Sequence, residues 1–479
     1  MSHDVTSAAP PAVAPEEVEV RNPWTVLGLM LMAQFMVILD VSVVNVALPS
    51  IGRALDFTDT DYQWTVSAYV LLSGGLLLFG GRLADLLNRR TMFLTGVGLF
   101  TAASLVSATA SSAAAMIISR GAQGAGAALL TPAALSIIMT AYTGKQRSTA
   151  LAIWGTIGSM GIAAGVLFGG ILTSALGWQA IFFINVPIGL AAAALTVRNV
   201  AQGQRTGSVR RLDVPGAATA VTGLLALVYG IEGTGTHGWT SARTLTAFLV
   251  SAALLTAFAV IERRVPAPLV PPSTWRIRSL VSASTVMAVI TGAVVGAIFI
   301  SSLFIQRVLD SSPVITGLRF LPLAVAITLG ATIASKLLGR VTPKAMMVVG
   351  LLIVAVGTAL LAGMDADPGY VTDVLPAFVV IGSGVGPMFV AISVAAMAGI
   401  AHEQSGLASG LMMTGHEVGA AIGVASLTAI AGDLTTRTGL LEAYPRVFVA
   451  ITVAMVVLAA FATVAVPQRP EPGRQAAMH

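Results

Sequence analysis

Three ionisable residues lie deep within long apolar stretches, where a charged side chain is expensive. Asp40 stands in the run 24–48, which carries no other charge, while Arg120 and Glu417 lie within the runs 113–134 and 405–431. An ionised side chain at the centre of a bilayer costs about 2.5–3.5 kcal/mol even on the most lenient scale. Residues retained at such a cost typically move protons, ions or charged solutes.

Asp40 and Arg120 are predicted to lie at compatible depths. At 1.5 Å per helical residue, Asp40 is about 21 Å up an outward-running helix and Arg120 is roughly 12 Å down an inward-running one. Both fall in the outer half of a hydrocarbon core about 30 Å thick. Gln123, Gly124 and Ala127 share the helical face of Arg120, and the small residues predict a close approach by the first span. We therefore expect Asp40 and Arg120 to interact directly or through water; the alternative is a static ion pair that only fixes packing.

Methionines precede both deep acids at helical spacing. Met32, Met36 and Asp40 recur every four residues, as do Met413 and Glu417. Methionine forms an adaptable apolar wall, and an acid beside it attracts a lipophilic cation, although such a stripe is also common in packed cores. His416 either titrates or serves as a hydrogen-bonded packing residue. We assign proton coupling to Asp40, Arg120 and Glu417, and the lining of a substrate cavity to Met32, Met36, Asn45, Gln123, Met413, His416 and Glu417.

The elements that position these residues are membrane-spanning helices. The 479-residue chain is 56% hydrophobic and only 10% charged, so it has too little polar surface for a soluble shell of this size. Fourteen apolar runs predict fourteen spans with both termini on one side, at approximately 24–48, 63–80, 92–109, 113–134, 149–172, 178–197, 212–231, 244–261, 281–304, 314–338, 345–363, 374–399, 405–431 and 447–466.

Basic residues indicate which side holds the termini. With both termini inside, the outer loops hold only five of the 26 Lys and Arg residues, while most of the others lie on the inner side. An excess of Lys and Arg marks cytoplasmic loops, which favours cytoplasmic termini and accounts for the net charge of +5 without nucleic acid. The five outer residues are Arg53, Arg243, Arg307, Arg437 and Arg446.

A weak internal repeat predicts the domain organisation. Short basic loops follow the second and tenth runs, at 81–90 and 336–344, as expected for two related six-helix bundles with two extra helices between them. The expected units are a disordered cytoplasmic tail (1–22), an N-terminal six-helix bundle (23–200), a linker with two inserted helices (201–265), a C-terminal six-helix bundle (266–467) and a second cytoplasmic tail (468–479).

Other motifs indicate packing, and several function classes are absent. Gly161, Gly165 and Gly169 are spaced by four residues, which predicts a groove for close helix contact. The sequence has no phosphate-binding Gly-rich loop, no metal-ligand cluster, no nucleophile elbow and no cysteine. We therefore expect no enzymatic activity, metal or cofactor. The expected partners are a small-molecule substrate, protons and the lipid bilayer, with the chain acting as a monomer.

Several segments together resemble a known family. The stretch 39–49, the Gln63-Trp64 pair with Tyr69, the loop at 81–90, the stretch 120–124 and the stretch 178–189 are similar, in this order, to motifs of the fourteen-span drug:proton antiporters of the major facilitator superfamily. The resemblance covers nearly the whole chain. It implies proton-driven export by alternating access, often of lipophilic cations, and a conformational role for the loop motif of Gly81, Arg82, Asp85, Arg89 and Arg90.

The chain departs from the family pattern at two places. Gly165-Val166 stands where the antiporter motif usually has Gly-Pro, and His416-Glu417 stands where Arg-Gln is common. The combined expectation is efflux of small lipophilic, often cationic, antibiotics or toxic metabolites across a bacterial plasma (inner) membrane. The alternatives are a dedicated exporter of one endogenous metabolite, a proton symporter, and a non-transporting membrane sensor or assembly subunit.

Overall fold

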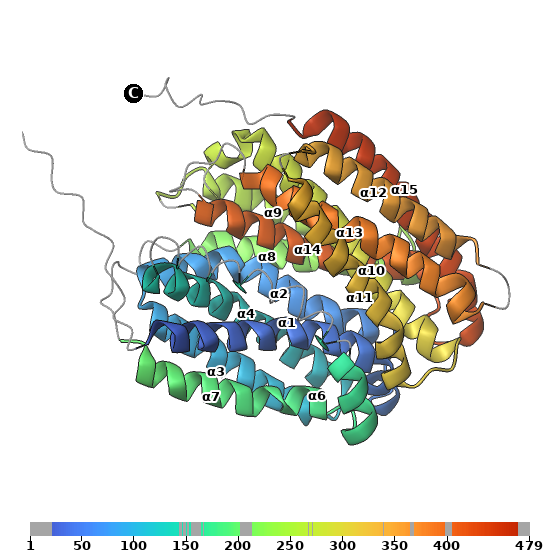
Figure 1. Ribbon diagram of the computed structural model, residues 1–479, viewed down its shortest axis with the longest axis horizontal. Helices are drawn as coiled ribbons and strands as arrows, with labels where there is room; N and C mark the ends of the chain where they lie inside the picture. Colours follow the sequence, from blue (N-terminus) through green and yellow to red (C-terminus); the bar gives the residue numbers. More distant parts are fainter. Residues whose placement is uncertain are drawn as a thin grey trace, which may run out of the picture.

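The computed structural model is built from helices in the residues that it describes, which are 22–142, 146, 150, 153–154, 164–165, 167–201, 213–266, 268–270, 272–338, 340–364, 368–397 and 405–467 (Figure 1). The expected tails and part of the linker therefore lie outside the described residues. The helices are α1 (Pro23–Ala54), α2 (Asp59–Leu86), α3 (Arg89–Ala108), α4 (Ala113–Ala141), α6 (Ala180–Phe183), α7 (Asn185–Asn199), α8 (Val214–His237), α9 (Ala242–Glu262), α10 (Arg278–Arg307), α11 (Pro313–Leu337), α12 (Pro343–Ala362), α13 (Leu375–Met397), α14 (Ser405–Ala431) and α15 (Arg437–Ala465).

The long helices begin where the sequence supplies capping groups. The Asn22 side chain accepts hydrogen bonds from two backbone N–H groups at the start of α1, and Thr58 forms a capping box with Asp61 at the start of α2. Asn88 caps α3 in the same way as Asn22 caps α1. These caps satisfy backbone donors that a helix leaves free at its first turn.

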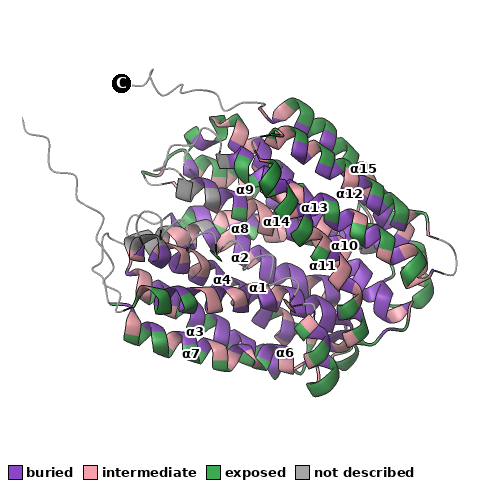
Figure 2. Ribbon diagram, in the orientation of Figure 1, coloured by how far each residue is buried: buried purple, intermediate pink, exposed green. Residues whose placement is uncertain are grey.

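Eleven helices of the described chain are long and apolar enough to cross a membrane. Exposed residues lie along the outer helices (Figure 2), and many of them have large apolar side chains, as expected for a protein surrounded by lipid. The most exposed span is α9, of which only 17% is buried, whereas 67% of the best window of α1 is buried. The chain is therefore a multi-pass membrane protein in which α1 is a central helix and α9 a peripheral one.

Two groups of helices pack mainly among themselves. In the N-terminal group (α1–α4, α6 and α7), α4 packs against both α2 and α3. In the C-terminal group (α10–α15), α13 packs between α11 and α12, and α10 packs against α14. The groups meet where α2 lies along α14 and α1 along α10, and α8 packs against both α2 and α14 at this junction.

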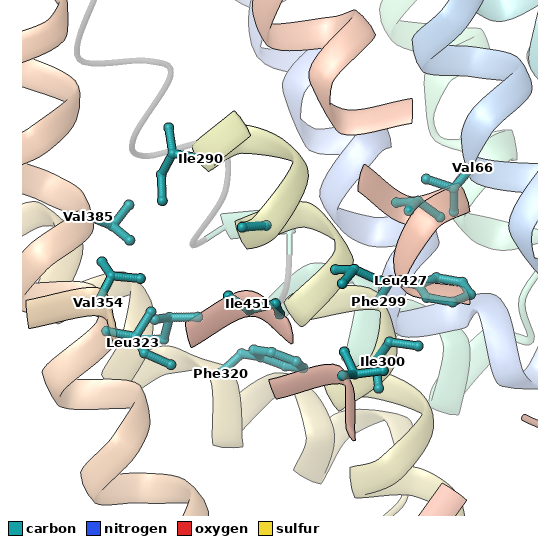
Figure 3. Packing of buried hydrophobic residues seen from close by; sticks show 14 of the residues in the cluster. Val66, Ile290, Phe299, Ile300, Phe320, Leu323, Val354, Val385, Leu427 and Ile451 are labelled. Carbon is teal, nitrogen blue, oxygen red and sulfur yellow. The ribbon is translucent and has the colours of Figure 1, made fainter. Parts of the chain in front are cut away.

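The apolar core continues across the junction of the two groups. The larger cluster runs through α10–α15 and includes Val66 of α2 near Leu427 of α14 and Phe299 of α10 (Figure 3). The second cluster fills the N-terminal group and extends to Ala421 of α14. Close-packed side chains at the junction hold the two groups together.

Candidate functional site

Asp40 lies near the middle of α1 and is only 1% exposed. Two of the predicted packing glycines bring another segment of the chain against α1 at this point. A Cβ atom at Gly165 would lie 2.5 Å from Ser42 Cβ, and one at Gly169 would lie 3.0 Å from Val43 Cα. Both glycines are therefore needed for close approach beside Asp40, while Gly161 and Val166 lie outside the described residues.

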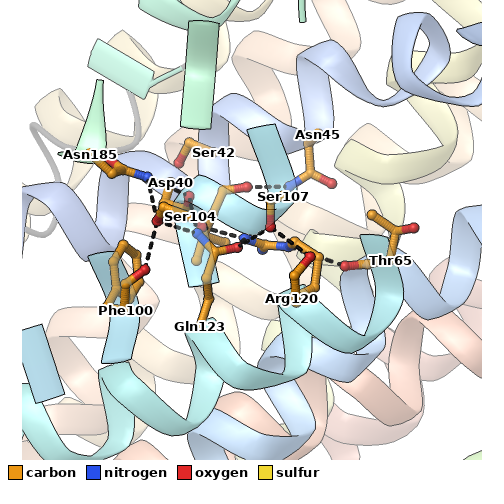
Figure 4. A network of polar contacts seen from close by, with 12 residues as sticks. Asp40, Ser42, Asn45, Thr65, Phe100, Ser104, Ser107, Arg120, Gln123 and Asn185 are labelled. Carbon is orange, nitrogen blue, oxygen red and sulfur yellow. Dashed lines mark hydrogen bonds and ion pairs between the residues drawn. The ribbon is translucent and has the colours of Figure 1, made fainter. Parts of the chain in front are cut away.

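The Asp40 carboxylate accepts hydrogen bonds from three side chains (Figure 4). Arg120 Nη1 pairs with Oδ2, and Oδ1 accepts from Gln123 Nε2 at 3.1 Å and Asn185 Nδ2 at 2.9 Å. All four side chains are at most 2% exposed. A buried carboxylate needs this degree of pairing, because an unpaired one would not stay ionised in an apolar interior.

Helix α3 supplies hydroxyl groups that hold Gln123 in place. Gln123 Nε2 donates to Ser104 Oγ at 2.8 Å, and Ser104 in turn donates to the Phe100 carbonyl at 2.8 Å. Ser107 Oγ lies 3.3 Å from Gln123 Oε1 and 2.8 Å from Ser119 Oγ. The network thus joins α1, α3, α4 and α7. A change in the charge of Asp40 would therefore alter hydrogen bonds in four elements of one helix group.

Arg120 also contacts α2. Its Nε donates to the Thr65 carbonyl at 3.3 Å, and its guanidinium carbon lies 4.4 Å from the centre of the Tyr69 ring. The Phe182 ring lies on another side at 6.0 Å. The sequence analysis was wrong about Gly124: it brings α4 close to α2 rather than to α1, because a Cβ there would lie 2.2 Å from the Tyr69 carbonyl oxygen.

The pair makes the two residues energetically dependent on each other. Removing either charge would leave the other charge buried without its partner, which typically costs about 3–5 kcal/mol.

Glu417 and His416 lie on α14, across the junction from this network. Glu417 is 18% and His416 36% exposed, and their Oε1 and Nδ1 atoms lie 3.6 Å apart. The backbone of α14 approaches α2 here, since a Cβ at Gly74 would lie 2.2 Å from Glu417 Cβ. The structure thus places Glu417 at the contact of the two helix groups and not within the Asp40 network.

The predicted cavity residues differ in their surroundings. Met36 is fully buried in the apolar core, while Met413 is 38% exposed and Gln123 belongs to the Asp40 network. Asn45 donates to the Val41 carbonyl of its own helix, and Met32 is partly buried against the same core as Met36. Among the described residues, cavities of about 640 and 600 Å³ are lined by other side chains, so the assigned cavity stays a prediction.

The predicted loop motif lies at the end of α2 and the start of α3. Arg90 Nη1 donates to the Val200 carbonyl at 2.8 Å and so joins α3 to the end of α7. Gly81 and Arg89 are partly buried, while the side chains of Arg82 and Asp85 lie outside the described part of the chain. The structure therefore ties one member of this motif to a neighbouring helix end.

A second polar contact region lies between α1 and α10. Ser302 Oγ donates to the Asn45 carbonyl at 2.7 Å, and Gln306 Nε2 donates to the Val46 carbonyl at 2.9 Å. Together with the contacts of the next residue, Arg307, these bonds form what we term the α1–α10 latch. The latch joins the two helix groups through side chains of one and backbone carbonyls of the other.

Arg307 extends the latch to α2 and to the segment before α15. It donates to the Tyr62 hydroxyl and to the Leu434 carbonyl, and its guanidinium lies 4.9 Å from the Tyr62 ring centre. The Leu434 N–H donates to Asp59 Oδ1 at 3.2 Å. The junction is therefore closed by several bonds at the end of α1 that follows Asp40.

The sequence analysis missed Asn185, Tyr69 and the latch. Asn185 and Tyr69 both stand in segments that resembled family motifs, but neither was assigned a role. Ser302 and Gln306 are neutral residues in an apolar helix, which are common and carry little signal. A cue was nevertheless present in the latch, because Ser302 and Gln306 are four residues apart and therefore share one face of their helix.

A multi-pass helical fold with a buried ionic network is typical of membrane transporters. The chain belongs to the Major Facilitator Superfamily, whose family model matches residues 30–424. It is 37% identical to the puromycin resistance protein pur8 of Streptomyces alboniger, over 90% of this chain and 86% of the relative. It is 35% identical to the cephamycin export protein CmcT of Amycolatopsis lactamdurans, over 91% of each chain. Its similarity to antibiotic resistance and export proteins thus extends over nearly its whole length.

Solved structures show the same fold at low sequence identity. A peptide transporter POT in complex with sulfate has a TM-score of 0.68 and 15% identity, covering 93% of this chain and 96% of that one. A bacterial homologue of the human lysosomal transporter Spinster, in an inward-facing and occupied conformation, has a TM-score of 0.64 and 19% identity, covering 92% and 96%.

Proposed function

We propose that this chain exports small lipophilic antibiotics or toxic metabolites in exchange for protons, by alternating access in a bacterial plasma membrane. Asp40 is the main proton carrier, Arg120 tunes it, and Glu417 is a second titrating or substrate-facing group. The observation that carries this proposal is the Asp40–Arg120 pair, which is buried, hydrogen-bonded and confined to one helix group.

The proposed topology has fourteen spans with both termini in the cytoplasm. Besides the eleven helices that meet the length and hydropathy requirements, it includes α2, α14 and the short apolar helix 167–176. The N-terminal and C-terminal helix groups then correspond to the bundles 23–200 and 266–467, and α8 and α9 are the inserted pair. In this topology the α1–α10 latch lies on the outer side.

The latch supports alternating access. A transporter of this kind closes one side of its central site while the other side opens, largely by rocking one bundle against the other. Here the outer ends of α1 and α10 are bonded together, and a substrate could leave to the outside only after Ser302 and Gln306 release the α1 carbonyls. The structure is thus consistent with an outward-closed state.

The relatives suggest the kind of substrate. Their names include resistance to puromycin, export of cephamycin, and resistance to and export of tetracenomycin C, which supports a compound of antibiotic size for this chain. An exporter dedicated to one endogenous metabolite would use the same proton site. A resistance panel in an efflux-deficient host, with chemically varied compounds, distinguishes a broad from a narrow range.

Transport by the purified protein in proteoliposomes tests the proposal. We expect an imposed pH gradient to drive puromycin or another active panel compound against its concentration gradient, in the direction opposite to the proton. One proton moving across 100 mV supplies about 2.3 kcal/mol, enough for a gradient of roughly 50-fold. Movement of substrate and proton in the same direction would instead establish a symporter. Absence of transport for every panel compound would favour a sensor or assembly role.

A further inference from the structure

Tyr69 of α2 lies between the ionic network and the second helix group. Its side chain is buried to 99%, and its ring stacks against the Arg120 guanidinium at 4.4 Å. Its backbone is held against α4, because Gly124 leaves no room for a Cβ beside the Tyr69 carbonyl oxygen. The position of the ring is therefore fixed by the packing of α2 on α4.

The Tyr69 hydroxyl has no hydrogen-bond partner among the described residues. Buried tyrosine hydroxyl groups usually have one, since an unsatisfied polar group in an apolar interior is unfavourable. The Asp40 carboxylate, by contrast, accepts hydrogen bonds from Arg120, Gln123 and Asn185. Among the described residues, the Tyr69 hydroxyl is thus a free donor at the edge of a network in which the carboxylate itself is fully paired.

Glu417 is a charged residue of the other helix group that lies beside α2. Helix α14 lies along α2, and a Cβ atom at Gly74 would lie 2.2 Å from Glu417 Cβ. The Tyr69 hydroxyl is within electrostatic range of Asp40 from α1, Arg120 from α4 and Glu417 from α14. His416, next to Glu417 on α14, is another titratable group at this contact. Tyr69 therefore lies in the region between the two carboxylates to which the proton-coupling role was assigned.

We propose that Tyr69 is a positioning residue that links the protonation of Asp40 to Glu417 across the junction. The link rests on the proposed function of proton-coupled export. No covalent step passes through Tyr69: the tyrosine keeps its proton, and its hydroxyl, which is unpaired among the described residues in this conformation, becomes a hydrogen-bond donor to Glu417 when Asp40 is protonated. Its ring meanwhile keeps contact with Arg120.

Protonation of Asp40 changes the balance of charge around Arg120 and Tyr69. When a proton forms an O–H bond with the Asp40 carboxylate, Arg120 loses its counterion and the N-terminal group carries one unpaired positive charge. The remaining carboxylate near Tyr69 is Glu417, so the Arg120–Tyr69 pair is drawn toward α14. A cationic substrate at Glu417 opposes this movement. Protonation and substrate release therefore favour the same arrangement, which is the requirement for exchange.

The Tyr69→Phe variant tests the link, because it removes the hydroxyl and retains the ring on Arg120. We expect normal expression and normal exchange of substrate without a pH gradient. Uphill transport driven by the gradient should fall at least tenfold, and its rate should vary less with pH than in the wild type. Tyr229→Phe, at a tyrosine of α8 outside the network, is the matched control and should behave as the wild type.

Two outcomes overturn the link. One is a Tyr69→Phe protein with the wild-type rate of uphill transport and the wild-type pH profile. The other is a Tyr69→Phe/Glu417→Gln double variant whose loss equals the product of the two single losses, since groups that act through each other are not additive. Failure of the wild-type protein to respond to a pH gradient would instead contradict the proposed function, so the two failures are distinct.

Discussion

The two helix groups stabilise their buried polar side chains in different ways. The N-terminal group encloses an ion pair, Asp40–Arg120, with amide and hydroxyl groups around it. The C-terminal group encloses neutral hydroxyl pairs: Ser301 Oγ lies 3.0 Å from the Tyr444 hydroxyl, and Thr358 lies 2.9 Å from Thr452. Similar helical architectures thus contain one core with a buried ion pair and one with neutral hydroxyl pairs.

The difference assigns separate tasks to the groups. Breaking a neutral hydrogen bond costs about 0.5–1.5 kcal/mol, whereas removing one partner of a buried ion pair costs about 3–5 kcal/mol. In the proposed mechanism, a proton that binds Asp40 would therefore change the free energy of the N-terminal group more than the loss of one hydroxyl hydrogen bond would change that of the C-terminal group. The C-terminal group contributes Glu417 and the latch, both of which lie at the junction.

Stabilising hydrogen bonds of the latch are accompanied by an unpaired buried amide on α2. The latch holds α10 to α1, yet Gln63 of α2 is fully buried and neither of its amide atoms has a partner among the described residues. An unsatisfied buried group costs about 1–3 kcal/mol, which is similar to the contribution of one or two latch bonds. We expect an open junction to admit water to Gln63 while it breaks the latch, which would bring the closed and open states close in free energy.

Arg120→Ala should have the largest effect, because it leaves Asp40 buried without a cation. We expect a loss of about 3–5 kcal/mol in stability, seen as a large fall in the melting temperature of the detergent-purified protein, and complete loss of transport. The Asp40→Asn/Arg120→Ala double variant removes both charges and should regain much of the melting temperature. Equal stability of the single and double variants would contradict the assigned ion pair.

Asp40→Asn should abolish coupling with less damage to the fold, because Arg120 keeps its hydrogen bonds to the Thr65 carbonyl and Gln123 Oε1. An amide is similar in size and can still bond Gln123 and Asn185, but it cannot carry a proton. We expect uphill transport to fall at least about tenfold, equivalent to about 1.4 kcal/mol in the activation free energy. Glu442→Gln, at an exposed acid of α15, is the matched control. Proton-driven transport that persists in Asp40→Asn would exclude Asp40 as the main carrier.

The sequence was sufficient to predict the central pair and the class of protein. Charges in apolar runs are rare enough to be conspicuous, and the rise of a helix converts their positions into depths. The contact of Asp40 with Arg120 followed from that arithmetic. The superfamily followed from several motifs in order, and the family model confirms it.

The remaining contacts depend on which faces of different helices pack together. The spacing of residues along one helix does not determine which neighbouring helix packs on that face. Asn185 reaches Asp40 because α7 packs beside α1, and Ser302 reaches α1 because α10 crosses the junction there. Met36 followed the same periodicity as Asp40 but is buried in apolar contacts. Helical periodicity thus predicts a shared face but does not say what covers it.

Gln306→Leu tests whether the latch holds the junction closed. The variant removes the donor to the Val46 carbonyl, and a bond of about 1 kcal/mol shifts a two-state equilibrium roughly fivefold toward the outward-open state. The chain has no cysteine, so spin labels can be attached to two introduced cysteines, at positions 50 and 312, without removing natural thiols. The population of long inter-label distances should rise.

The matched variant for Gln306→Leu is Gln63→Leu, which removes an unsatisfied buried amide. It should shift the same equilibrium toward the closed state, because the closed junction no longer buries an unpaired polar group. Identical distance distributions in both variants and the wild type would show that neither residue sets the equilibrium.

Tyr444→Phe tests whether the neutral hydroxyl pairs of the C-terminal group contribute only to stability. Loss of the Ser301–Tyr444 bond should lower stability by about 1 kcal/mol and leave the pH dependence of transport unchanged. Ser301→Ala should have a similar effect, and the double variant should lose no more than either single one, since all three remove the same bond. A change in the pH profile would mean that the C-terminal group also takes part in coupling.

Asp433→Ala should have the smallest effect on stability. Asp433 is an exposed carboxylate and can be compared with the buried carboxylate of Asp40. It lies exposed before α15, where its Oδ1 accepts from the Thr435 and Thr436 N–H groups, and hydrogen bonds from the Thr436 and Thr435 side chains lower its pKa to about 2. Because the folded-state pKa is lowered, its stabilisation is present above the unfolded-state pKa of about 3.9 and is lost as the pH falls toward about 2. The difference in melting temperature between the wild type and Asp433→Ala should therefore be constant from pH 7 to about 5 and shrink below it. Transport at neutral pH should not change, because this exposed carboxylate lies outside the ionic network; a transport defect would show that it acts through the neighbouring latch.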